Sequence, residues 1–144
     1  MVKSLPDKYI RKSIFDRFNG TLVDGVTINV YDSRYTSTTD ENGAYVLMTV
    51  QSNDVLYNKC SNFWSSTILL EVCTLYGATS NVGSRLLADN VLEALRASMV
   101  ADLDLTGSGL VVDSQLMFFP NDLATVLPNG TFFRKFLRLE LRIK

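Results

Sequence analysis

Residues 131–144, TFFRKFLRLELRIK, alternate between two chemically different sets of side chains up to the last residue. A period of two over this length predicts a β-strand, because successive side chains leave opposite faces of a sheet. One set is apolar apart from Lys135: Phe133, Leu137, Leu139, Leu141 and Ile143. The other set is aromatic and mostly charged: Phe132, Arg134, Phe136, Arg138, Glu140 and Arg142.

The two faces of this strand predict two different roles. The apolar face can supply part of a hydrophobic core. The aromatic and arginine-rich face has a composition that is enriched at protein–protein contacts. We therefore expect the opposite side of the sheet from the core to meet a partner.

The same periodicities divide the whole chain into elements. Helical spacing predicts helices over 7–19 and 85–101. Alternating or continuously apolar residues predict strands over 26–30, 45–51, 63–76, 110–119 and 131–144. The segment 123–130 is interpreted as a turn region. The segment 33–44, rich in small polar residues, is predicted to be an exposed loop or a hairpin tip, and 52–61 to be irregular. The order α-β-β-β-α-β-β predicts an α+β fold, with two helices packed on one face of a mostly antiparallel sheet of about five strands.

Length and composition indicate a single globular domain, 1–144. Hydrophobic residues make up 47% and charged residues 20%, with 14 basic against 15 acidic side chains. This balance provides no global attraction to nucleic acid or to an anionic membrane, and no apolar run approaches the length of a membrane span, so no membrane partner is expected. The mean hydropathy of +0.11 is high for a small domain and favours oligomerisation.

The residues that usually carry catalysis are scarce. The chain has no histidine, which removes Ser-His and Cys-His nucleophile schemes and most zinc sites, and the two cysteines, Cys60 and Cys73, form no close pairing motif. Asp102, Asp104 and the later Asp113 and Asp122 could suggest a hard-metal site, but their spacing matches no calcium loop. We therefore predict no catalytic residues, no metal and no cofactor.

Glu71 is isolated among apolar residues of the long strand 63–76. A carboxylate on a largely buried strand needs a cationic partner, and the arginines of the last strand are the candidates. This interpretation, a structural or inter-subunit ion pair, is favoured over a catalytic acid because no second catalytic group accompanies Glu71. At the start of that strand, Tyr57, Phe63 and Trp64 fit equally well as core rings or as interface anchors.

The basic residues of the last strand also allow a nucleic-acid interpretation. Arginines placed among phenylalanines can contact phosphates and stack on bases. The slightly acidic chain without a recognition motif argues against it.

The order of the elements and the residues within them resemble those of a known family. The stretches LPDKYIRKSIFDRFNG, VTINVYDSR, YVLMTVQS, WSSTILLEVCTLYG, GSRLLADNVLEAL and RKFLRLELRIK follow one another as in the tail terminator and head–tail joining (neck) proteins of tailed bacteriophages. The resemblance implies a non-enzymatic subunit of a homo-oligomeric ring, with six or twelve copies. It implies contacts with adjacent neck or tail rings, the tail tube or the portal-side connector, and DNA only passing through the lumen. It also implies a place in the virion after assembly in the host bacterial cytoplasm.

Two hypotheses follow. The first is a structural ring subunit of a phage neck or tail, in which the polar loop contacts another ring component through Arg34, Tyr35, Asp40 and Glu41. Its expected subunit interface comprises Tyr57, Phe63, Trp64, Glu71, Phe132, Arg134, Phe136, Arg138 and Arg142. The alternative is a monomeric binding module whose aromatic–arginine face takes a peptide or single-stranded nucleic acid.

Overall fold

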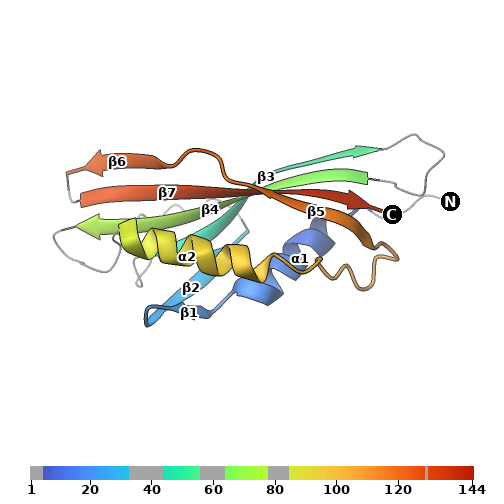
Figure 1. The fold of residues 1–144 in the computed structure, drawn as a ribbon, viewed down its shortest axis with the longest axis horizontal. Helices are drawn as coiled ribbons and strands as arrows, with labels where there is room; N and C mark the ends of the chain where they lie inside the picture. The colour runs from blue at the N-terminus through green and yellow to red at the C-terminus, as the bar shows by residue number, and fades with distance from the viewer. Residues whose placement is uncertain (1–4, 33–43, 56–63, 78–84, 129) are drawn as a thin grey trace.

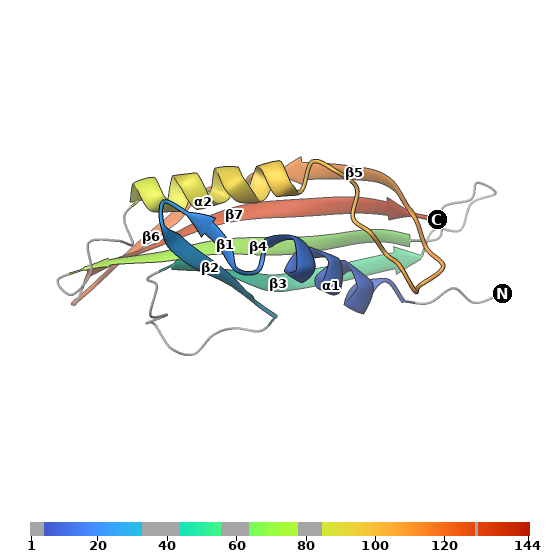
Figure 2. The ribbon, with the colours of Figure 1, turned by 90° about the horizontal axis from the view of Figure 1, so that it is seen from below.

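The computed structural model describes residues 5–32, 44–55, 64–77, 85–128 and 130–144. Two helices lie against one face of a long, twisted sheet, and the other face carries no helix of the described chain (Figure 1; Figure 2 views the helix side). The elements are α1 (Asp7–Phe18), β1 (Thr21–Val23), β2 (Val26–Tyr31), β3 (Ala44–Val55), β4 (Trp64–Gly77), α2 (Arg85–Ser98), β5 (Val112–Phe118), β6 (Leu123–Leu127) and β7 (Gly130–Ile143).

The sheet is built around the pair of β4 and β7. These strands are antiparallel over their whole length, from Trp64 opposite Ile143 to Gly77 opposite Gly130. The strand order is β1-β2-β3-β4-β7-β5, and β6 also pairs with β7. Since β4 occupies one side of β7, β5 and β6 share the other side: β6 pairs with the first part of β7 and β5 with the last part.

The prediction of about five strands is wrong: the sheet has seven, and it is mixed because β2 and β3 pair in parallel while the other pairs are antiparallel. The three-residue β1 is too short to show a period, and β6 lies in the segment interpreted as a turn. Strands β2 and β3 are parallel, which excludes a hairpin between them. A parallel pair needs a connection of about a dozen residues, and 32–43 is long enough to supply one. The two helices on one face of the sheet are as predicted.

The helices dock through apolar stripes. In α1, Ile10, Ile14 and Phe18 recur every four residues and are at most 1% exposed. The chain then turns at Gly20, whose φ of +79° is readily adopted by glycine. In α2, Leu87, Val91 and Leu95 face the sheet in the same way.

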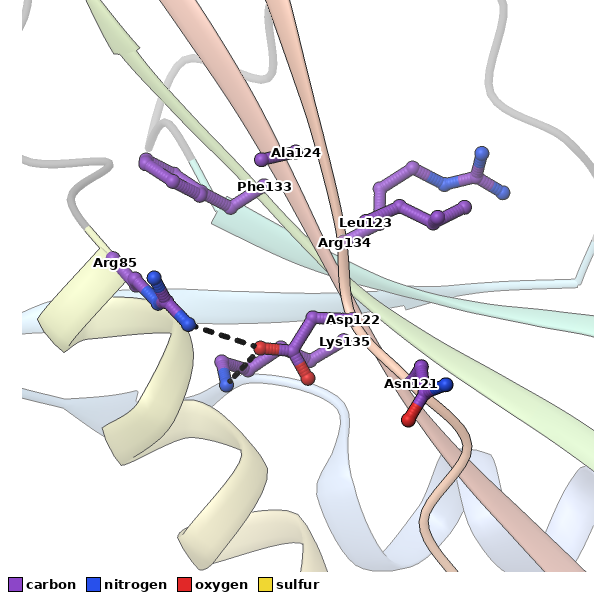
Figure 3. A pocket seen from close by; sticks show the side chains of 8 residues that line it. All are labelled: Arg85, Asn121, Asp122, Leu123, Ala124, Phe133, Arg134 and Lys135. Atoms are coloured by element: carbon purple, nitrogen blue, oxygen red, sulfur yellow. Dashed lines mark hydrogen bonds and ion pairs between the residues drawn. The ribbon is translucent and has the colours of Figure 1, made fainter.

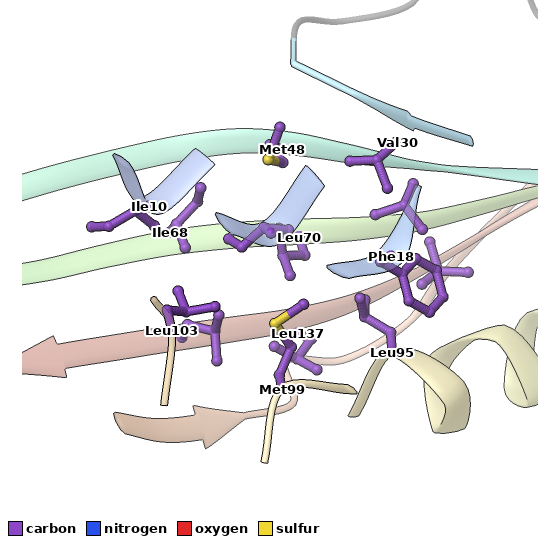
Figure 4. Close-up of a cluster of buried hydrophobic side chains, with 14 of the residues drawn as sticks. Ile10, Phe18, Val30, Met48, Ile68, Leu70, Leu95, Met99, Leu103 and Leu137 are labelled. Carbon is purple, nitrogen blue, oxygen red and sulfur yellow. The ribbon is translucent and has the colours of Figure 1, made fainter. Parts of the chain in front are cut away.

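A single core fills the space between helices and sheet (Figure 4). From the sheet it receives Ile68 and Leu70 of β4 and the predicted apolar face of β7, in which Leu137, Leu139, Leu141 and Ile143 are at most 1% exposed. Burial of an aliphatic side chain of this size contributes about 2 kcal/mol, so this core accounts for the packing of both helices.

Arg17 links the two helices at their ends. Its guanidinium donates to the carbonyl oxygens of Ser98 at 3.2 Å and Ala101 at 2.5 Å, and also to that of Asp102. Carbonyl groups after the last turn of a helix have no partner within that helix. Arg17 of α1 therefore caps the C-terminal end of α2. Neither described helix is long and apolar enough to cross a membrane.

Candidate functional site

The sheet face opposite the helices is here called the open face. It carries the aromatic and charged side chains of β7 together with Thr67, Leu69, Glu71 and Cys73 of β4 and Leu116 and Phe118 of β5, as the strand registers require. The strand alternation predicted for 131–144 thus places Phe132, Arg134, Phe136, Arg138, Glu140 and Arg142 together on one surface.

Glu71 has the predicted arginine partner on the last strand. Arg134 Nη2 donates to Glu71 Oε1 at 2.6 Å, and the side chains are 30% and 9% exposed, respectively. Glu71 lies directly opposite Phe136, so Arg134 reaches it diagonally across the two strands. The guanidinium of Arg134 also lies 5.4 Å from the centre of the Phe136 ring. The ion pair and the ring keep a charged group on an otherwise largely buried part of the face.

Next to this pair lies a small apolar cluster of Tyr45, Leu47 and Cys73, with Tyr31 and Phe132 packed against it. Burial, helped by the negative charge of Glu71, raises the pKa of the Cys73 thiol to about 12, although Arg134 and Tyr45 act in the opposite direction. A thiol with this pKa is almost never a thiolate near neutral pH, so Cys73 is a packing residue without nucleophilic chemistry.

Arg138 marks the exposed part of the open face. Its guanidinium lies 5.1 Å from the centre of the Phe118 ring, and its Nε lies 3.4 Å from Glu140 Oε1. Beside it is a shallow groove of about 380 Å³. The groove is lined by Thr67, Leu69, Pro120, Asn121, Leu123, Phe136 and Arg138. Such a groove, largely apolar with a cation at one side, fits an apolar side chain or strand of another protein.

The outer strands add an apolar surface that sequence analysis missed. Leu116 and Phe118 of β5, Phe119, and Leu123 and Val126 of β6 are all exposed, Val126 by 83%. We call these five residues the apolar edge. It was missed because 123–130 was interpreted as a turn region, whereas Leu123–Leu127 form β6 and pair with β7. The dense apolar residues of 116–119 and 123–127 were the available signal.

On the helix side, Lys135, the exception in the apolar pattern of the last strand, has two acidic partners. Its Nζ lies 2.6 Å from Asp89 Oδ1 and 2.9 Å from Asp122 Oδ2. Arg85 Nη2 lies 3.5 Å from the same oxygen of Asp122 (Figure 3). Burial lowers the pKa of Lys135, but the hydrogen bonds to both carboxylates outweigh it and raise that pKa overall. These four residues join α2 to the β5–β6 junction.

The remaining predicted site residues lie in different parts of the structure. Trp64 is half-buried and packs against the helix-side core, which agrees with the core interpretation of this ring. Arg142 is exposed on the open face, and Phe136 is only 8% exposed there. Tyr57, Phe63, Arg34, Tyr35, Asp40 and Glu41 lie outside the described residues. Among the described residues, no three acidic or cysteine side chains gather where a metal could bind.

The chain is similar to solved structures in its fold but matches no known family and no curated protein in its sequence. Its structure is similar to a chain from a structure described as the virion of a native gene transfer agent particle, with a TM-score of 0.59. The two chains are 14% identical, and the match covers 95% of this chain and 97% of that one. Over nearly its whole length, the chain is therefore similar in fold to a chain of that particle.

Proposed function

We propose that this chain is a structural, non-enzymatic subunit of a phage-like virion, which assembles as a ring in the neck or tail. The observation that carries the proposal is the shared fold over nearly the whole length of both chains, since the similar chain comes from a virion particle. The element order that resembles tail terminator and head–tail joining proteins supports the same assignment.

The surface of the subunit supports assembly through copies of itself. Leu116 and Phe118 of β5 and Leu123 of β6 are exposed on the open face, where Leu123 lines the groove and Phe118 lies opposite its residue Arg138. Contiguous apolar surface of this kind marks protein contacts. Contacts between two different surfaces of identical subunits close into a ring when the rotation between neighbours divides a full turn.

The proposal is tested by measuring the mass of the purified chain with light scattering, for the natural sequence and for Arg138→Glu. We expect a closed oligomer for the natural chain and a shift toward monomer for the variant, whose new carboxylate faces Glu140 beside the groove. Circular dichroism should be unchanged because Arg138 is exposed and outside the core.

Arg96→Glu is a matched control. Arg96 is 41% exposed against 44% for Arg138, and each arginine pairs with one nearby glutamate, but Arg96 lies on α2. We expect the control to keep the oligomer. A natural chain that is monomeric at high concentration and is never incorporated into particles would exclude the ring proposal.

The alternative is a monomeric module that binds single-stranded nucleic acid or a peptide through the same groove. The same purified protein distinguishes it from the ring proposal. The alternative requires a monomer that is retained on nucleic acid at low salt and released as salt rises, because phosphate contacts release counterions. Arg138→Glu should then lower retention without any change of mass.

A further inference from the structure

We infer that neighbouring subunits join their sheets edge to edge, with β5 of one copy pairing with the second half of β3 of the next. This inference rests on the proposed ring and names the contact that would close it. Two strand edges are covered by no strand of the described chain. One is the outer side of β5, the last strand in the sheet order. The other is the outer side of Gln51–Val55, because β2 pairs only with Tyr45–Leu47 of β3.

The two uncovered edges lie at the same level on opposite sides of the sheet. Following the registers across the strands, Ser52 lies opposite Thr67, Thr67 opposite Glu140, and Glu140 opposite Leu116. Two residues further along β3, Asp54 lies opposite Ser65, Ser65 opposite Arg142, and Arg142 opposite Ser114. At this end of the molecule, the sheet is therefore a four-stranded block, β3-β4-β7-β5, that is open on both sides.

The strand directions fit a cyclic arrangement. Each neighbouring pair in the block is antiparallel, so β5 runs opposite to β3. A rotation about an axis along the strands leaves strand directions unchanged. Such a rotation brings β5 of one copy beside β3 of the next as an antiparallel pair, which joins without a crossover and forms slightly more stable pairs than parallel strands do. It also keeps the rows level, so Leu116 meets Ser52 of the neighbouring copy.

The chemistry of both edges favours pairing over exposure. Strand edges that remain in water are usually protected by lysine, proline or a short length. Asp113 and a bulge lie at the start of β5, but residues 114–118 have no charged residue, no proline and no bulge, and they expose Leu116 by 56% and Phe118 by 39%. On the other edge Val55 is 46% exposed. The α1 helix fixes this half of β3 through side chains, with Arg11 donating to Gln51 and Asn53 donating to Asp7, so the strand is held ready to pair.

Cross-linking in the full chain tests this contact. In a Cys60→Ser background, Ser52→Cys and Leu116→Cys are combined, and the assembled protein is treated with a short bis-maleimide. Both positions are exposed on the open face, and the buried Cys73 does not react. We expect a ladder of covalent multimers from the double variant and none from either single variant, because each link joins two different edges.

A mismatched pair, Ser52→Cys with Val126→Cys, serves as the control, because Val126 lies on β6 near the opposite end of β7. It should produce no ladder. Dimers from Leu116→Cys alone would show two β5 edges facing each other and would overturn the inference. A closed oligomer by light scattering with no cross-link in the matched pair would also overturn it, while leaving the ring proposal standing. A chain that never assembles would remove the ring proposal itself.

Discussion

Lys135 Nζ lies 2.6 Å from Asp89 Oδ1, joining β7 to the outer layer of the molecule through α2. Lys135 is 8% exposed, whereas the side chains of its partners Asp89 and Asp122 are 50% and 41% exposed. The buried member of the network is thus Lys135, since the side chain of Arg85, the other cation, is 68% exposed. Removing the cation and removing the carboxylates should therefore have different consequences.

Lys135→Met should change the free energy of unfolding by only about 1 kcal/mol, because an apolar chain of similar volume fills the site and the two carboxylates are left in contact with water. The double variant Asp89→Ala/Asp122→Ala should cost more, about 3 kcal/mol, because the buried ammonium then lacks a counter-charge. Urea unfolding of both variants measures the difference. Equal losses would show that burial of Lys135 does not govern the network.

The same network predicts loss of stability in acid. The hydrogen bond from Lys135, more than any other influence, holds the pKa of Asp122 below its usual value. When folding lowers the pKa of a carboxyl group, the ionised group stabilises the folded state at pH values above its pKa in the unfolded chain. That stabilisation is lost as the pH falls through the pKa of the group in the folded protein. We expect the difference in unfolding free energy between the natural chain and Asp122→Asn to be present at about pH 7 and to shrink below about pH 4. A difference independent of pH would contradict this assignment.

Arg17→Ala should destabilise the fold by about 1–2 kcal/mol, because carbonyl oxygens after α2 lose a charged donor. Arg17→Lys should restore only part of the loss, since one ammonium cannot reproduce the two guanidinium nitrogens that contact Ser98, Ala101 and Asp102. Thermal unfolding followed by circular dichroism measures both variants. Full recovery with lysine would mean that charge alone matters at this position.

Arg134→Met should cost about 3 kcal/mol, because it leaves the Glu71 carboxylate buried without a partner. Replacing both residues, as Glu71→Leu/Arg134→Met, should recover most of that loss, since two apolar chains then pack on the open face. A double-mutant cycle in urea isolates the coupling between them. Additive losses would show that the 2.6 Å contact contributes nothing in solution.

In the Cys60→Ser variant, Cys73 should resist alkylation in the native state and react at the rate of unfolding in urea. Its native pKa of about 12 lies above the ordinary value of 9.0, chiefly through burial. Because the unfolded thiol loses its proton first, stability should fall as pH rises from about 9 toward 12. Fast alkylation of the folded protein at neutral pH would contradict the burial of this side chain.

Sequence pattern predicted the parts of this protein that depend on local repetition. The stripe Ile10, Ile14 and Phe18 predicted a helix, and the alternation of 131–144 predicted both faces of β7. The need of Glu71 for a counter-charge correctly indicated an arginine of the last strand. These features follow from the periods of helices and strands and from the cost of burying a lone charge, which can be inferred from residue types alone.

The rest was decided by contacts between distant parts of the chain. The parallel pairing of β2 with β3, and the return of β6 to β7 after Pro120, depend on which neighbour is available to pair, and no local pattern contains that information. Lys135 breaks the apolar period of β7, and its partners Asp89 and Asp122 were apparent only once α2 and the β5–β6 junction were packed around it. The apolar edge likewise exists because β5 and β6 share the last free side of β7, a consequence of strand order that only tertiary structure decides.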